Sequence, residues 1–161
     1  MTIERMEVER MIPADAAAIF GVLRDPHGHV TIDSSGMLMD ASGEPATAVG
    51  DSFVVHMDRE ALNDYPMGQY DVTVKITTYV PDREIAWTIE GVINPPIGHV
   101  YGYKLEPVEG GTLVTSYYDW SKIGENWKEA NVFPITPESA LRATLGILAR
   151  TVTRASRGAP G

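Results

Sequence analysis

The sequence predicts an α+β fold in which a curved, seven-stranded antiparallel sheet is closed by one long C-terminal helix, with two short helices after the first strand. Three observations lead to this prediction. Residues 136–157 have the spacing of an amphipathic helix. Most segments between residues 37 and 120 alternate apolar and polar residues, as strands with one buried face do. The turns between these segments are short, which favours antiparallel neighbours.

Length, charge and cysteine content limit the function classes. The 161 residues are 43% hydrophobic, so we expect one domain spanning residues 1–161. A net charge of -9 would repel phosphate groups, which excludes nucleic acid and anionic membrane surfaces as favoured partners. The absence of cysteine excludes disulfides, thiolate metal sites and cysteine nucleophiles. No signal-peptide pattern or membrane-length apolar run is present, so we expect a cytoplasmic protein without an integral membrane segment.

The C-terminal helix is predicted over residues 136–157. Thr136 can serve as its N-cap, and Pro137 fits the first helical position, where no backbone amide is needed. Apolar side chains then recur at steps of four, three and four on one face: Leu141, Leu145, Leu148 and Val152. A helix of this length extends about 30 Å and must bury that stripe. We therefore expect it to pack on the sheet.

Alternation and turn residues predict the remaining elements. They are a strand over 3–11, a helix over 14–23, a short helical or irregular piece over 27–34, strands over 37–41 and 52–58, a loop over 59–68, strands over 70–80 and 85–90, a break at 94–96, and strands over 99–105 and 112–120. In the 70–80 strand the even-numbered residues, from Tyr70 to Val80, are expected to face inward. The odd-numbered set of the 99–105 strand and the even-numbered set of the 112–120 strand should do the same.

A strongly curved sheet closed by a single helix leaves space between the two, and we expect a cavity there. Its wall would be apolar in bulk, with several hydroxyls and one imidazole to orient a ligand. For any one of these aromatic residues, filling the core is favoured, whereas for the set we expect at least two to line the cavity. The candidate ligand-binding residues are His29, Tyr70, Val74, Trp87, His99, Tyr101, Tyr103, Tyr118, Leu141 and Leu145. His29 is the candidate for a polar gate.

Four sequence motifs occur in order around the predicted helices. They are Ala16-Ala17-Ala18-Ile19-Phe20-Gly21-Val22-Leu23-Arg24-Asp25-Pro26, Val49-Gly50-Asp51-Ser52-Phe53, Pro81-Asp82-Arg83-Glu84-Ile85-Ala86-Trp87 and Gly110-Gly111-Thr112-Leu113-Val114-Thr115. With these motifs the chain resembles the START-like or SRPBCC superfamily over nearly its whole length. The resemblance implies a helix-grip fold, with the sheet wrapped round the last helix and a deep apolar cavity between them. One departure is the segment after Asp25-Pro26, where many relatives have a tryptophan and this chain has His27-Gly28-His29.

The resemblance does not imply one activity, because the superfamily hosts carriers, receptors, co-chaperone modules and a few enzymes. We expect binding or transport of an apolar or aromatic small molecule, such as a lipid or a polyketide. The first alternative is a polyketide cyclase or dehydratase, in which His99 would be the base and Tyr101 or Tyr103 the donor to a developing enolate. The second is a ligand-free protein-interaction module. Monomer and homodimer are both open.

Other chemistry has little support in the sequence. His27 with His29, and His56 with Asp58, are pairs two residues apart, whereas a metal site needs three or four convergent ligands. We therefore expect no metal and no cofactor. No Ser/His/Asp arrangement, phosphate loop or dinucleotide fingerprint is predicted. In the aromatic and polar segment 117–128, Trp127 is a candidate lid, subunit contact or hydrophobic plug.

Overall fold

The computed structural model describes residues 4–60, 67–91 and 96–158 of the chain. The elements in chain order are β1 (Arg5–Ile12), α1 (Ala16–Arg24), α2 (Pro26–Ile32), β2 (Leu38–Ser42), β3 (Ser52–Asp58), β4 (Gln69–Val80), β5 (Glu84–Glu90), β6 (Val100–Val108), β7 (Gly111–Asp119), α3 (Glu125–Ala130) and α4 (Glu138–Gly158). This arrangement confirms the predicted α+β helix-grip fold. Most of the expected loop over 59–68 and most of the break at 94–96 lie outside the described residues.

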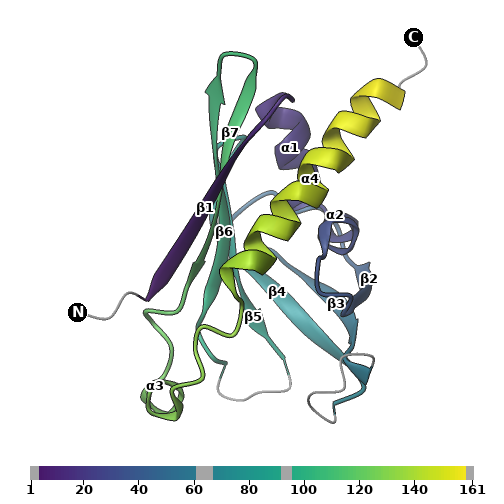
Figure 1. The fold of residues 1–161 in the computed structure, drawn as a ribbon. Helices are drawn as coiled ribbons and strands as arrows, with labels where there is room; N and C mark the ends of the chain where they lie inside the picture. Colours follow the sequence, from purple (N-terminus) through teal and green to yellow (C-terminus); the bar gives the residue numbers. More distant parts are fainter. Residues whose placement is uncertain (1–3, 61–66, 92–95, 159–161) are drawn as a thin grey trace.

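The sheet has seven antiparallel strands in the order β1-β7-β6-β5-β4-β3-β2. Strands β2 to β7 are neighbours in sequence order, as short turns predict. The first strand instead pairs with the last, with Arg5 opposite Asp119 and Ile12 opposite Thr112. Figure 1 shows α4 crossing the face of this sheet, with α1 and α2 beside it.

Helix α4 buries the predicted apolar stripe. Leu141, Leu145, Leu148 and Val152 are all at most 5% exposed. The helix contacts β1, β7, α1 and α2, so its buried face joins the sheet and the two N-terminal helices into one core. Its start differs from the prediction, because the first helical residue is Glu138 and the Thr136 hydroxyl bonds a tyrosine on β6 rather than the helix backbone.

The inward-facing pattern of β4 changes partway along the strand. Val74 and Ile76 are buried as predicted, at 2% and 1% exposed. The pairing with β5 then shifts by one residue between Ile76 and Thr78, so a β-bulge exchanges the two faces beyond it. Tyr79 therefore packs against Phe20 with ring centroids 5.3 Å apart, and Val80 is 46% exposed. The prediction that Thr78 and Val80 face inward was wrong for this reason.

The N-terminal helices are held together by a close backbone approach. Pro26 occupies the first turn of α2, and the Asp25 side chain accepts a hydrogen bond from the His27 backbone amide. Gly28 lies against the backbone of Val22, where any Cβ would collide with the Val22 carbonyl oxygen. This contact fixes α2, and with it His29, over the edge of the sheet.

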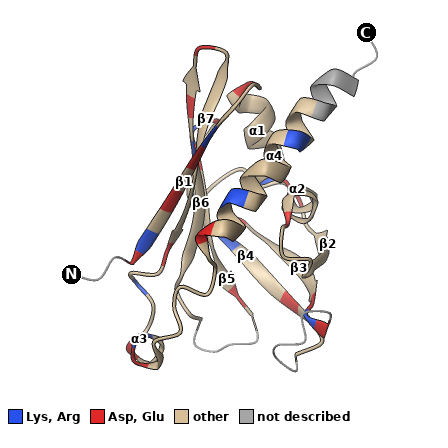
Figure 2. Cartoon of the chain, in the orientation of Figure 1, with Lys and Arg blue, Asp and Glu red and all other residues tan. Residues whose placement is uncertain are grey.

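Within the described part of the chain, no helix combines the length and apolar composition needed to cross a membrane. Cytoplasmic location stays a prediction. Figure 2 shows acidic residues distributed over several elements, including β1, β5 and α3, while basic residues occur along α4.

Candidate functional site

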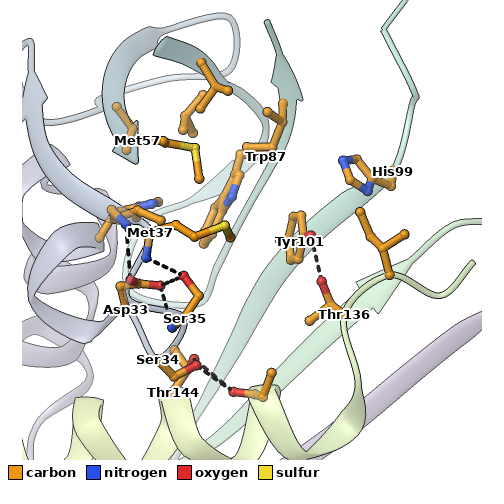
Figure 3. A pocket seen from close by; sticks show the side chains of 18 of the residues that line it. Asp33, Ser34, Ser35, Met37, Met57, Trp87, His99, Tyr101, Thr136 and Thr144 are labelled. Carbon is orange, nitrogen blue, oxygen red and sulfur yellow. Dashed lines mark hydrogen bonds between the residues drawn. The ribbon is translucent and has the colours of Figure 1, made fainter. Parts of the chain in front are cut away.

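A cavity of about 360 Å³ lies between the concave face of the sheet and helices α2 and α4. It is lined by side chains from strands β2 to β7, from α2 and the segment after it, and from the first turns of α4. Figure 3 shows Trp87 near the middle of the cavity, with Asp33, Ser35 and Met37 on one side and His99, Tyr101 and Thr136 on the other. The volume falls near the lower end of the range for ligand pockets, about 300–1,000 Å³.

The wall is mainly apolar because alternate residues of four adjacent strands face the same space. The aliphatic and thioether lining comes from Ile32, Met37, Leu38, Val55, Met57, Met67, Val72, Val74, Ile89, Ile97, Ile135, Ala140 and Leu141. Trp87 and Tyr103 add a stacked aromatic pair with ring centroids 5.9 Å apart. Such a wall favours an apolar ligand through burial of its surface.

His29 is a neutral wall residue of this cavity. It is 7% exposed, and its ring lies 4.9 Å from the Phe53 ring and 4.5 Å from the Trp87 ring. Burial lowers the pKa of His29 to about 4, against the smaller opposing effect of its bond to the backbone. Its Nε2 lies 2.7 Å from the Leu23 carbonyl oxygen. The imidazole is therefore uncharged near neutral pH and fixed in orientation.

His99 and Tyr118 form a buried pair at the opposite end of the cavity, where His99 lines the cavity and Tyr118 lies behind it. His99 Nδ1 lies 2.8 Å from the Tyr118 hydroxyl. Burial lowers the pKa of His99 to about 4, and burial followed by the nearby Tyr101 raises the pKa of Tyr118. Both groups are therefore neutral over the physiological range. An imidazole with so low a pKa is a weak general base near pH 7.

Tyr101 ties the sheet to the segment that leads into α4. Its hydroxyl lies 2.8 Å from the Thr136 hydroxyl, and its ring stacks on Tyr118 with centroids 4.6 Å apart. Burial raises the pKa of Tyr101, and it raises the pKa of Tyr103 to about 12. The tyrosines of this wall are hydrogen-bonding groups rather than acids at neutral pH.

The opposite side of the cavity is polar and hydrogen-bonded within the protein. The Asp33 carboxylate accepts from the backbone amides of Ser35, Gly36 and Leu38 and from the Ser35 hydroxyl. The Ser34 hydroxyl lies 2.9 Å from the Thr144 hydroxyl, and this contact connects the segment after α2 to α4 (Figure 3). The chain thus spans the gap between the two helices at this point.

The predicted ligand-binding residues fall into two groups. His29, Tyr70, Val74, Trp87, His99, Tyr101, Tyr103 and Leu141 all line the cavity. Tyr118 and Leu145 are not among the lining residues, because both are enclosed in the core at 0% and 2% exposed. A role of the first group in binding a ligand stays a prediction.

Sequence reasoning missed the polar residues on the α2 side, Asp33, Ser34 and Ser35, and the facing Thr144. It also missed the flexible methionines Met37 and Met57 in the wall. The serines follow α2 in an irregular segment, where no periodicity predicts which way each side chain points. Thr144 lies one turn after Ala140 at the margin of the leucine stripe, which was the only available signal.

The described residues bring no third ligand to either histidine pair, and the absence of a metal stays a prediction. His27 and His29 separate, since the His27 side chain is 66% exposed whereas His29 is buried. Among the described residues, no three His, Cys, Asp or Glu side chains lie close enough to hold a metal ion. The absence of a cofactor stays a prediction.

The expectation of no Ser/His/Asp arrangement was wrong. His56 Nε2 lies 2.8 Å from the Ser42 hydroxyl, and His56 Nδ1 lies 2.8 Å from the Asp71 carboxylate. Three neighbouring strands bring these residues together, so spacing along the chain gave no signal. The Asp71 side chain is 64% exposed, and none of the three lines the cavity. A triad needs oxyanion donors and a substrate pocket as well, so this contact is assigned to pairing across the sheet surface.

Trp127 lies on α3, a helix that the sequence analysis did not predict. It is half-buried and packs edge-on against Phe133, with ring centroids 6.0 Å apart. Phe133 in turn contacts His99 at 5.9 Å. Trp127 does not line the cavity, and its contact with Phe133 agrees with the role of a hydrophobic plug on the approach to α4.

Comparison with known proteins identifies relatives of the chain. A sequence model of the family described as polyketide cyclase / dehydrase and lipid transport matches residues 4–153. An uncharacterised protein of Mycobacterium tuberculosis is 26% identical over 150 residues, or 89% of this chain and 62% of the relative, so this chain spans less than two thirds of that protein's length.

Solved structures share the fold at low sequence identity. A protein from Nitrosomonas europaea matches with a TM-score of 0.68 and 12% identity, covering 98% of this chain and 99% of the other. The Aha1 dimer from Colwellia psychrerythraea matches with a TM-score of 0.59 and 19% identity, covering 93% and 96%.

Proposed function

Because the chain belongs to the polyketide cyclase / dehydrase and lipid transport family, we propose that it binds an apolar or aromatic small molecule in the cavity between the sheet and α4. The observation that carries the proposal is the cavity itself, at about 360 Å³ with a wall of aliphatic, thioether and aromatic side chains. A core whose purpose was packing alone would be filled to the density of an organic crystal.

The electrostatics support a neutral ligand. Both cavity histidines have a pKa near 4 and are uncharged at neutral pH, and the tyrosine hydroxyls remain protonated. An apolar molecule with one or two polar groups fits this part of the wall, because a charged group would lose its hydration without a compensating charge at these side chains. The charged lining residues, Asp33 and Arg59, already bond within the protein, Asp33 to backbone amides and Arg59 to the Met37 sulfur.

Binding is tested with the neutral dye N-phenyl-1-naphthylamine, whose fluorescence rises in an apolar site, and with mass spectrometry of compounds retained by the purified protein. Ala140→Phe places a bulky side chain in the cavity wall and should abolish most dye binding. Ala143→Phe, on the exposed face of the same helix, is the matched control and should bind as the parent does. Equal binding by both variants, or none by the parent, would contradict the proposal.

A cyclase or dehydratase acting in the same cavity is the alternative function. The contact of His99 with Tyr118 and the nearby Tyr101 hydroxyl supports it. It is less well supported than binding, because among the described residues no carboxylate hydrogen-bonds His99 to raise its basicity. His99→Gln should stop turnover of a poly-β-ketone while dye binding persists if the alternative holds. The ligand-free interaction module would show neither.

The expectation of a monomer or a homodimer stays a prediction. The Colwellia relative is described as a dimer. Light scattering of the purified protein at two concentrations distinguishes the two.

A further inference from the structure

His29 presents a hydrogen-bond acceptor in the cavity wall. A backbone carbonyl only accepts, so the 2.7 Å contact between His29 Nε2 and the Leu23 carbonyl oxygen requires the proton on Nε2. The ring is neutral near pH 7 and carries one proton, which leaves Nδ1 with a free lone pair. Nδ1 has no hydrogen-bond partner among the described residues.

Trp87 presents a donor beside it. The indole Nε1 can only donate, and it too has no hydrogen-bond partner in the described part of the chain. The side chain is 8% exposed, and its ring centroid lies 4.5 Å from that of His29. A donor and an acceptor therefore belong to neighbouring side chains in a wall that is mainly apolar.

Both atoms open onto free space rather than being sealed in the core. In the buried and half-buried residues that the structure describes, every side-chain nitrogen or oxygen without a hydrogen-bond partner has some accessible surface. Since Nδ1 of His29 and Nε1 of Trp87 have no partner, each must have accessible surface, and the space that both residues line is the cavity. Figure 3 shows the Trp87 side chain pointing into it.

We infer that the ligand carries a hydroxyl group, as an alcohol or phenol, whose oxygen accepts from Trp87 Nε1 and whose proton is donated to His29 Nδ1. The inference rests on the proposed binding function and narrows its ligand class. A hydroxyl both donates and accepts, so it satisfies the pair with one group. An ether or ketone oxygen can accept from Trp87 Nε1 but has no proton to donate, so it would leave His29 Nδ1 unpaired. A carboxylate oxygen would bring a lone pair against the lone pair of His29 Nδ1.

The test uses three ligands that share one ring system: 2-naphthol, 2-methoxynaphthalene and 2-naphthoate at pH 7.5. Each is measured by displacement of N-phenyl-1-naphthylamine. We expect 2-naphthol to bind about ten-fold more tightly than either of the others, the size of loss expected when a site's polar groups are left unpaired.

Trp87→Phe removes the donor and keeps an aromatic ring, and should reduce the preference for 2-naphthol several-fold. Trp120→Phe is the matched control, because Trp120 is also 8% exposed but does not line the cavity, and it should keep the full preference. Should Trp87→Phe not fold, the parent's ranking of the three ligands still decides.

Equal binding of 2-naphthol and 2-methoxynaphthalene by the parent would overturn the inference and leave the binding function intact. A folded Trp87→Phe variant that keeps the parent's preference for 2-naphthol would also overturn the inference and leave the binding function intact. If no ligand and no dye binds the parent, the proposed function fails, and this inference fails with it.

Discussion

Acid should destabilise this protein well above the pH at which carboxylates titrate, because two histidines are buried uncharged. His29 and His99 have a pKa of about 4 when folded and an ordinary value of 6.5 when unfolded. Between these values the unfolded chain binds more protons than the folded one, so the free energy of unfolding falls as the pH falls. The contribution is complete above pH 6.5 and is lost progressively toward pH 4.

The size of the effect follows from the two pKa values. At pH 5, each histidine costs about 2 kcal/mol relative to pH 7.5, so the pair costs about 4 kcal/mol. This is a large part of the 5–15 kcal/mol that roughly spans the stability of most domains. Urea unfolding followed by circular dichroism at both pH values measures it directly.

Variants identify the groups responsible. His29→Gln should reduce the stability difference between pH 7.5 and pH 5 by about 2 kcal/mol, whatever its effect at either pH alone. His27→Gln on the same helix is the matched control, because the His27 side chain is 66% exposed, and it should keep the parent's difference. If His29→Gln also keeps that difference, the argument that His29 is buried and neutral is refuted.

Three further predictions concern two packed sites and one contact at the cavity. Gly28→Ala should lower the free energy of unfolding by at least about 2 kcal/mol, because its Cβ would collide with the Val22 backbone. The control Gly21→Ala, whose Cβ would meet no atom within 4 Å, should be neutral or stabilising. Equal free energies of unfolding for the two variants in urea would contradict the close approach. Leu148→Ala, at a fully buried site, should cost about 3–5 kcal/mol in the same assay, and a loss below about 1 kcal/mol would remove it from the core. Ser34→Ala breaks the contact with α4 and should speed dye release in stopped-flow measurements; an unchanged rate would mean that the contact does not restrict access.

The fold could be predicted from the sequence because its signals are periodic and local. The leucine stripe of α4 follows helical geometry, and the alternation of β6, and of β4 as far as Ile76, follows strand geometry; burial confirmed both. The family prediction was confirmed by the match over residues 4–153. The β4 bulge was missed because nothing between Ile76 and Thr78 distinguishes it from regular alternation.

The site was harder to predict because lining a cavity depends on what stands opposite. Tyr101 and Tyr118 lie on the same face and stack on each other, yet only Tyr101 reaches the cavity. The Thr136 hydroxyl had a plausible local role at the helix start, but its partner is 35 residues away. Which side chain reaches the cavity, and which partner a hydroxyl bonds, depend on long-range contacts that local residue patterns do not predict.

The pairing of the first strand with the last has a consequence for synthesis on the ribosome. Arg5 and Asp119 are partners across 114 residues, and α4, which covers β1, comes later still. While the chain is being made, β1 has no partner strand until β7 has been synthesised. Newly made chains are therefore open to association with one another through the unpaired β1 segment, and a chaperone that shields β1 would be useful during that interval.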